Sequence, residues 1–127
     1  MGLEALSRGA AHVTFVECDG RALECLRANI AGLDALDETD VSALDVFEYL
    51  RRRVRYDIAL ADPPYGQGHA LRLTARFIEE PFAHLLCVEH AASDEVPTPG
   101  GAVRRRYGDT VITFVRSGDI DMSEEDQ

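Results

Sequence analysis

The chain has 127 residues, which suits one domain with its own core, and an apolar content of 46% excludes disorder throughout. Its net charge of −10 argues against binding of nucleic acid through a broad basic surface, because such binding depends on neutralising phosphates. No apolar run approaches the roughly 20 residues of a membrane span, and the first residues are too polar for a signal peptide. We therefore predict a cytoplasmic protein.

Strand and helix patterns alternate along the chain. Leu23, Leu26, Ile30 and Leu33, at spacings of three, four and three, form the stripe of an amphipathic helix. The β-branched and aromatic run HVTFVE is typical of a strand. In chain order we predict a helix over 2–9, a strand over 12–17, a helix over 20–33, a strand over 39–44, a helix over 46–53, a strand over 56–61, a helix over 70–80, a strand over 84–90 and a hairpin over 102–116 that turns at Gly108-Asp109.

This order indicates an α/β fold with a mostly parallel sheet and a C-terminal antiparallel hairpin. Residues 1–117 are predicted to form the domain, and residues 118–127 an acidic, disordered tail. Cys18, Cys25 and Cys87 show no CxxC spacing, so we expect three reduced, buried thiols and no metal site.

Three acids, Glu17, Asp45 and Asp62, each come just after an apolar strand segment. Ligands of open α/β sheets bind at the carboxyl ends of the strands, so we expect all three acids to face one crevice. Each acid also has a plainer interpretation. Glu17 suits a solvated acid before the next helix, Asp45 a helix N-cap, and Asp62 a strand-ending turn that caps the following helix.

The stretch Asp62-Pro63-Pro64-Tyr65 is suited to holding an amino group. Neither proline has an N–H, so a carboxylate and a carbonyl can stand side by side as two acceptors without a competing donor. An NH2 group bound through both hydrogens points its lone pair at an electrophile, which is catalysis by orientation. Tyr65 offers a flat face on which a base can stack.

The segments VTFVE, DVFEYL, ADPPYG, LLCVEH and RRRYGDT, in this order, resemble the RsmD-like 16S ribosomal RNA (guanine-N2)-methyltransferases. These are class I enzymes that use S-adenosylmethionine, so the resemblance implies a Rossmann-like sheet. It also implies that Glu17 accepts the ribose hydroxyls of the cofactor, and that Asp45, with the Val46 backbone, meets the adenine. Cys18 and Asp62 complete the cofactor-binding set. The flipped guanine would be held by Asp62, Pro63, Pro64 and Tyr65.

The glycine-rich cofactor loop of that family would come directly before GLEALSRG, and the chain starts there. We therefore expect an incomplete N-terminus, a missing first strand and weak or absent binding of S-adenosylmethionine. The strands over 12–17 and 56–61 would then lose a neighbour. We expect them to pair directly with each other, or to accept a strand from a second copy in a homodimer through the exposed edge.

Two arginine clusters and one histidine complete the candidates. Arg104, Arg105 and Arg106 lie near the active edge if their strand runs parallel to the others, where they could bind RNA phosphates or be solvated. The arginines at 51–53 and 55 are predicted to lie at the C-terminal end of a helix, where their positive charge would complement the helix dipole. His90 could touch RNA, or simply end its strand.

Three functions stay open at this point. The first is methylation of guanine N2 in ribosomal RNA. The second is an amino-methyltransferase of DNA, which the same DPPY chemistry permits. The third is a non-catalytic remnant of the fold, or a module that binds a partner.

Overall fold

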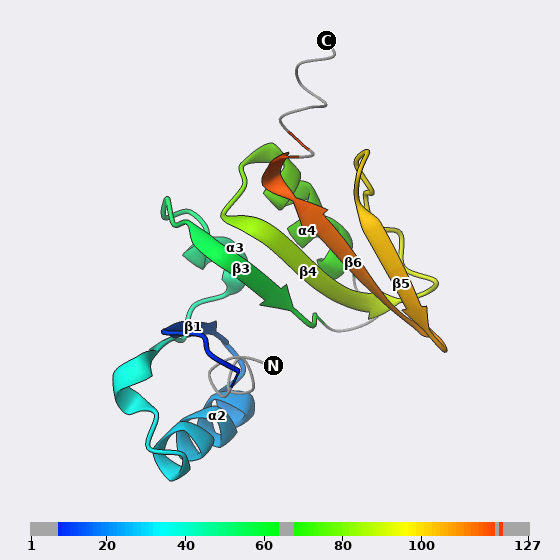
Figure 1. Ribbon diagram of the computed structural model, residues 1–127. Helices are drawn as coiled ribbons and strands as arrows, with labels where there is room; N and C mark the ends of the chain where they lie inside the picture. The colour runs from blue at the N-terminus through cyan, green and yellow to red at the C-terminus, as the bar shows by residue number, and fades with distance from the viewer. Residues whose placement is uncertain (1–7, 64–67, 119, 121–127) are drawn as a thin grey trace. The chain divides into compact units, whose positions relative to one another are not determined.

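The computed structural model describes residues 8–63, 68–118 and 120. The chain divides into two compact units, Met1–Arg52 and Arg53–Gln127, and each is described by itself (Figure 1). The helix predicted over 2–9 lies outside the described residues, so it stays a prediction. No helix in the described ranges has the length and apolar character needed to cross a bilayer.

The first unit is a parallel β-α-β arrangement. Its elements are β1 (Val13–Val16), α2 (Gly20–Gly32), the 3-10 turn η1 (Leu36–Glu38), β2 (Thr39–Ser42) and α3 (Val46–Tyr49). The strands β1 and β2 pair in parallel, which requires the helical crossover that α2 provides.

The helix α2 begins at an N-cap, Asp19, whose side chain accepts the N–H of Ala22 at 2.9 Å. Its buried residues are Leu23 and Ile30, two members of the predicted stripe. The stripe ends there, because Leu33 lies beyond the last helical turn and is 64% exposed.

The helix α3 is shorter than predicted. It ends at Tyr49 instead of continuing to residue 53, because the N–H groups of Arg51 and Arg52 bond back to the carbonyls of Glu48 and Tyr49, three residues earlier. The arginines therefore follow the helix and do not lie in its last turn. The guanidinium of Arg52 instead lies 5.4 Å from the centre of the Tyr49 ring.

The second unit holds a four-stranded sheet of order β3-β4-β6-β5. The strands β3 and β4 are parallel, whereas β6 is antiparallel to both β4 and β5. The bounds are β3 (Tyr56–Ala61), α4 (His69–Glu79), β4 (Ala83–Ala91), β5 (Val103–Tyr107) and β6 (Thr110–Arg116). The α/β class with mostly parallel strands and a closing antiparallel hairpin is thus confirmed.

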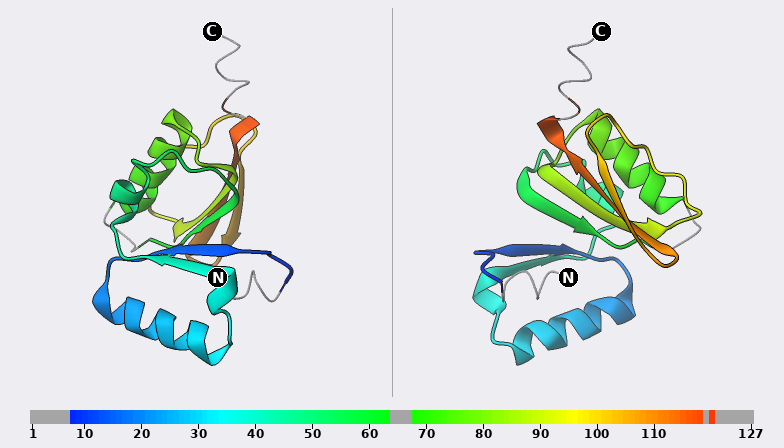
Figure 2. Two further views of the ribbon diagram at one scale, coloured as in Figure 1. Left: turned by 90° about the vertical axis from the view of Figure 1, so that its left-hand side faces the viewer. Right: turned by 45° about the vertical axis from the view of Figure 1, so that its right-hand side comes forward.

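The core of the second unit lies between α4 and one face of this sheet, as Figure 2 shows. Alternate residues of β4, among them Leu86 and Val88, are fully buried, and so is Val115 of β6. From α4 the buried Phe77 packs edge-on against Phe82, with ring centres 5.1 Å apart. The intervening residues of each strand point to the opposite face.

The direct pairing expected between the strands over 12–17 and 56–61 is wrong. The strand β1 pairs with β2 and β3 pairs with β4, and the described part of the chain contains no β1–β3 ladder. Within its own sheet β3 is an edge strand, and its residues Asp57, Ile58 and Leu60 are exposed.

Candidate functional site

Two of the three predicted acids lie at one edge of the first unit. The ladder between β1 and β2 ends with Val16 opposite Ser42, and the N–H of Glu17 donates to the carbonyl of Ser42 at 3.0 Å. Glu17 therefore follows the carboxyl end of β1 directly. Asp45 follows the carboxyl end of the neighbouring β2. The two acids therefore follow neighbouring strands at the same edge of this sheet.

Each of the two carboxylates is oriented by the local backbone. One oxygen of Glu17 accepts the N–H of Asp19 at 3.1 Å. One oxygen of Asp45 accepts the N–H of Phe47 at 2.9 Å, so Asp45 is the N-cap of α3, as its plainer interpretation had it. A carboxylate carries a second oxygen with two more lone pairs, so capping leaves acceptors for a ligand.

The neighbours of these acids are accessible. The predicted burial of the thiols is wrong for Cys18 and Cys25, which are exposed, and Cys18 lies directly after Glu17. Asp45 is exposed as well. Glu17 and Val46 are partly exposed. Asp19, which the sequence analysis did not single out, belongs to the same edge as the cap of α2. An aspartate directly before a glycine that opens a helical stripe was the signal for it.

The third acid, Asp62, lies at the carboxyl end of β3 in the second unit. The strand ends with Ala61 opposite Val88 of β4, so Asp62 is the next residue along that edge. It is exposed, and within the described ranges its carboxylate makes no hydrogen bond. It does not cap α4, because the N-cap there is Gly68, in left-handed conformation with a φ of 72°. The helix-cap alternative for Asp62 is therefore wrong.

Pro63 is described and partly exposed, whereas Pro64 and Tyr65 lie outside the described residues. The paired acceptors and the stacking face proposed for this stretch therefore stay predictions. So does the single crevice for all three acids, since Asp62 belongs to the other unit.

Arg104, Arg105 and Arg106 were predicted to lie near the active edge if their strand runs parallel to the others, and it does. Because β4 and β5 are both antiparallel to β6, β5 runs in the same direction as β3 and β4. The turn at Gly108 thus lies at the sheet edge that carries Asp62. All three arginines are exposed, and Nε of Arg106 donates to the carbonyl of Gly108 at 2.8 Å. The side chains alternate across the strand, so Arg104 and Arg106 point to one face and Arg105 to the other.

His90 is fully buried, so it ends its strand from inside the core. Its Nδ1–H donates to the carbonyl of Ala91 at 2.9 Å, and its Nε2 accepts the hydroxyl proton of Thr113 at 2.7 Å. This pair of hydrogen bonds fixes the orientation of the ring and joins β4 to β6 near the edge that carries Asp62. Arg55, from the other predicted cluster, donates to Ser117 Oγ at 3.3 Å.

The described residues include no group of three or more His, Cys, Asp or Glu side chains placed to hold a metal ion. Burial raises the pKa of the Cys87 thiol, and the nearby charge of Arg116 partly opposes this rise.

Comparison with known proteins identifies the family. The sequence profile described as Conserved hypothetical protein 95 matches residues 1–116. The chain belongs to this family. Membership in the Conserved hypothetical protein 95 family, together with its methyltransferase relatives, confirms the expected relationship to RsmD-like methyltransferases.

Two relatives carry names that state a reaction. Ribosomal RNA small subunit methyltransferase D of Buchnera aphidicola subsp. Acyrthosiphon pisum is 34% identical over 70 residues, which cover 54% of this chain and 36% of the relative. The putative rRNA methyltransferase YlbH of Bacillus subtilis is 28% identical over 127 residues, which cover 91% of this chain and 69% of the relative. The chain thus spans about a third of the first relative and about two thirds of the second.

Solved structures of the same architecture include a putative methyltransferase, yhhF, from Escherichia coli. It superposes with a TM-score of 0.75 at 25% identity, covering 91% of this chain and 67% of that one. A putative methylase from Haemophilus influenzae gives a TM-score of 0.77 at 24% identity and covers 91% of this chain and 78% of that one. The second likeness supports the fold alone.

Proposed function

We propose that this chain serves a cytoplasmic, S-adenosylmethionine-dependent methyltransferase that modifies the exocyclic N2 amino group of a guanine in 16S ribosomal RNA. The observation that carries the proposal is the placement of acids directly after parallel strands in a chain of the Conserved hypothetical protein 95 family. Ribosomal RNA is the substrate class named for the Buchnera and Bacillus relatives. The guanine and the 16S molecule come from the sequence resemblance.

The acids of the first unit suit the sugar and base of the cofactor. Glu17 and Asp45 each use one oxygen on a backbone N–H, and their remaining acceptors match hydroxyl and amino donors. In the proposed complex Glu17 accepts the ribose hydroxyls, and Asp45 and the Val46 backbone meet the adenine, with Cys18 beside them. When bound, S-adenosylmethionine supplies an electrophilic methyl group.

The second unit supplies the groups for the target amine. The carboxylate of Asp62 and a carbonyl of the proline pair accept the two hydrogens of the guanine NH2 group. Pro63 fixes its own φ and offers no N–H, so no internal donor competes for these acceptors. An amine held in this way would present its lone pair to a methyl donor, and Tyr65 would stack on the base. This is an entropic contribution through orientation, and it needs no strong general base.

The exposed arginines of β5 provide a local positive surface on a chain of net charge −10. Arg104, Arg105 and Arg106 lead to the turn at the edge that carries Asp62, where they could neutralise phosphates flanking the target nucleotide. Contacts of this kind position RNA and carry no sequence information themselves.

The test is a methyl-transfer assay with this chain, S-adenosylmethionine carrying a labelled methyl group, and unmodified small-subunit RNA. Mass spectrometry of the digested nucleosides should show N2-methylguanosine, and Asp62→Asn should remove it. Label in N6-methyladenine or N4-methylcytosine of a DNA substrate, with none in RNA, would favour the DNA amino-methyltransferase. A chain that binds the cofactor and transfers nothing to either polymer would support a non-catalytic role.

A further inference from the structure

The turn of the β5–β6 hairpin is held by contacts from two directions. Its two residues are Gly108 and Asp109, and Gly108 has a φ of 62°, the positive value that type II′ turns have at their first central position. The carbonyl of Asp109 accepts the N–H of Ala92, in the loop that follows β4, at 2.8 Å. The carbonyl of Gly108 accepts the Nε–H of Arg106, also at 2.8 Å. Both carbonyls of the turn are therefore engaged.

The bond to Gly108 orients the guanidinium of Arg106 and leaves its outer side available. A guanidinium carries five N–H donors in one plane, one on Nε and four on the two Nη atoms. Within the described part of the chain, the bond from Nε is the only polar contact of Arg106. Both partners belong to one hairpin, so this contact does not depend on the rest of the chain. The Nη pair is thus presented to an acceptor that can bind in two places at once, such as a phosphate.

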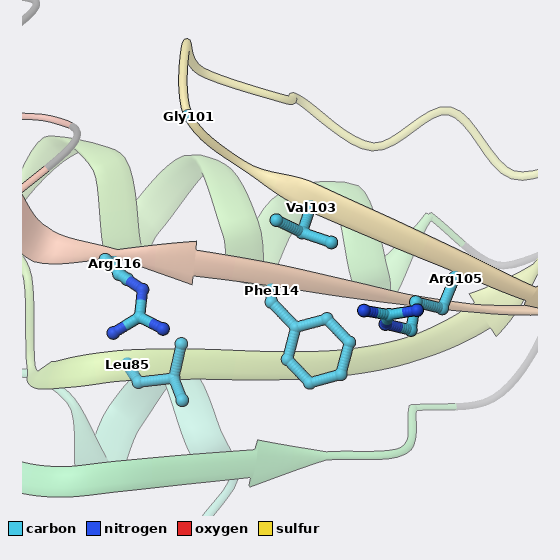
Figure 3. Close-up of a pocket in the computed structure, with 6 residues that line it drawn as sticks. All are labelled: Leu85, Gly101, Val103, Arg105, Phe114 and Arg116. Carbon is cyan, nitrogen blue, oxygen red and sulfur yellow. The ribbon is translucent and has the colours of Figure 1, made fainter.

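Three other arginines of the second unit lack this combination. Arg76 of α4 uses its terminal groups internally, because Nη1 donates to the carbonyl of Glu80 at 2.8 Å and Nη2 lies 3.6 Å from the carboxylate of Glu80. Arg105 points to the opposite face of the sheet from Arg106, where it lines the pocket shown in Figure 3. Arg104 shares the face of Arg106, but within the described ranges no hydrogen bond fixes its side chain.

The register of the sheet places Arg106 at the edge that carries Asp62. Through β6, Arg106 lies in the same row as His90 of β4. The row of Ala61, the last residue of β3, crosses β4 two residues earlier, and Asp62 follows Ala61 directly. The backbones of Asp62 and Arg106 are therefore one residue apart along the strands and three strand spacings apart across the sheet, each spacing being about 4.8 Å. A base at Asp62 and a phosphate at Arg106 can thus belong to one RNA strand.

We propose that Arg106 positions the RNA substrate by binding one backbone phosphate through its two Nη groups. The inference rests on the proposed function, which supplies RNA as the ligand and Asp62 as the site of the target amine. Fixing an arginine side chain costs conformational entropy, and the bond to Gly108 incurs part of that cost before RNA binds. Arg104 and Arg105 add mobile charges on the same strand. Arg106 is a positioning residue and takes no part in the methyl transfer itself.

This role is tested by fluorescence anisotropy of a short, labelled single-stranded RNA containing guanine, titrated with the full 127-residue chain over a range of salt concentrations. Arg106→Gln should weaken binding by about tenfold. It should also lower the slope of log affinity against log salt by about 0.7, the value for one phosphate on a single strand. The loss should be the same for a second RNA of different sequence, since a phosphate contact carries no sequence information.

Lysine variants separate the geometry of the guanidinium from its charge. Arg106→Lys keeps the charge but removes the Nε–H and the planar fork, so it should weaken binding by about fivefold. Arg104→Lys and Arg105→Lys are the matched controls on the same strand, and each should bind RNA like the wild type because a mobile charge is retained. Arg76→Gln removes a charge whose terminal groups already contact Glu80, and it should leave the salt slope unchanged.

Equal affinities among the three lysine variants would overturn the proposal, because charge alone would then account for the binding. An Arg106→Gln variant with the affinity and salt slope of the wild type also overturns it, as does a wild-type chain that does not bind the RNA. If circular dichroism shows Arg106→Gln to be unfolded, the lysine comparison decides. Methyl transfer to RNA by the wild type is measured in parallel. A chain that binds RNA through Arg106 and transfers no methyl group refutes the proposed reaction and leaves the phosphate contact standing.

Discussion

The two units hold their acidic residues by different means. In the first unit Glu17 and Asp45 each accept a backbone N–H from the segment that follows them, at 3.1 and 2.9 Å. In the second unit Asp62 is exposed and makes no hydrogen bond within the described ranges. Under the proposed function this contrast separates the roles. The acids that bind the cofactor are oriented in advance, whereas Asp62 acquires its partners from the substrate amine.

Substitution of Asp62 tests most directly whether the acids of the two units have different roles. We expect Asp62→Ala to lower methyl transfer by about a thousandfold, near 4 kcal/mol in the barrier, because the amine loses its orientation. The affinity for S-adenosylmethionine should stay within a few-fold of wild type. Radiolabel transfer and calorimetry measure the two quantities separately, and Glu17→Ala serves as the comparison. A loss of cofactor affinity as large as that of Glu17→Ala would reverse the assignment of roles.

A second prediction concerns the hydrogen bond that joins β4 to β6 near the sheet edge that carries Asp62. Thr113 donates to the buried His90, whereas the equally buried Thr74 of α4 has no hydrogen-bond partner in the described part of the chain. Thr113→Val should cost about 1–3 kcal/mol of unfolding free energy, because the His90 nitrogen is left unsatisfied. Thr74→Val removes an unpaired hydroxyl and should be neutral or stabilising. Urea denaturation measures both, and equal losses would show that the His90 pair adds nothing.

The three cysteines give a chemical comparison between the units. Cys18 and Cys25 of the first unit are exposed, whereas burial raises the pKa of Cys87 in the second. The thiolate is the reactive form, so a raised pKa leaves less of it at any pH below that pKa. We expect iodoacetamide at pH 8 to label Cys87 several-fold more slowly than the other two. Peptide mass mapping follows the labelling, and equal or faster labelling of Cys87 would show that its partial burial does not limit its reactivity.

Two aspartates of the first unit both cap helices, but only one of them is proposed to bind the cofactor. Asp19 caps α2 and Asp45 caps α3. We expect Asp19→Ala and Asp45→Ala each to lose about 1 kcal/mol of unfolding free energy, as is usual for a lost N-cap. Only Asp45→Ala should weaken S-adenosylmethionine binding as well. A matching loss from Asp19→Ala would mean that the cap alone, and not a contact with the adenine, determines the affinity.

The sequence predicted the local features of this fold well. The strands β1 and β3 and the helices α2 and α4 lie within a residue or two of their predicted bounds, because apolar periodicity and caps determine them. The parallel direction of β5, and with it the position of the Gly108 turn, depended on how the hairpin joins the sheet. The sequence could state that only as a condition.

The predictions that were wrong depend on tertiary structure, which local sequence patterns do not encode. Pairing between β1 and β3 joins segments about forty residues apart, and no local pattern says which neighbour an apolar strand takes. The burial of His90 could have been foreseen, since it continues the alternation of Leu86 and Val88 along β4. The exposed carboxylate of Asp62 could not, because the absence of a cap depends on where α4 begins.

The central claim is that Glu17 and Asp45 form the cofactor edge of a methyltransferase. An NMR titration of the isotopically labelled chain with S-adenosylhomocysteine tests it directly and works for weak binding. We predict that the largest amide shifts fall on residues 17–19 and 45–47 and disappear together in Glu17→Ala. Binding whose shifts fall elsewhere, or a titration up to millimolar ligand that leaves residues 17–19 and 45–47 unmoved, would contradict the claim.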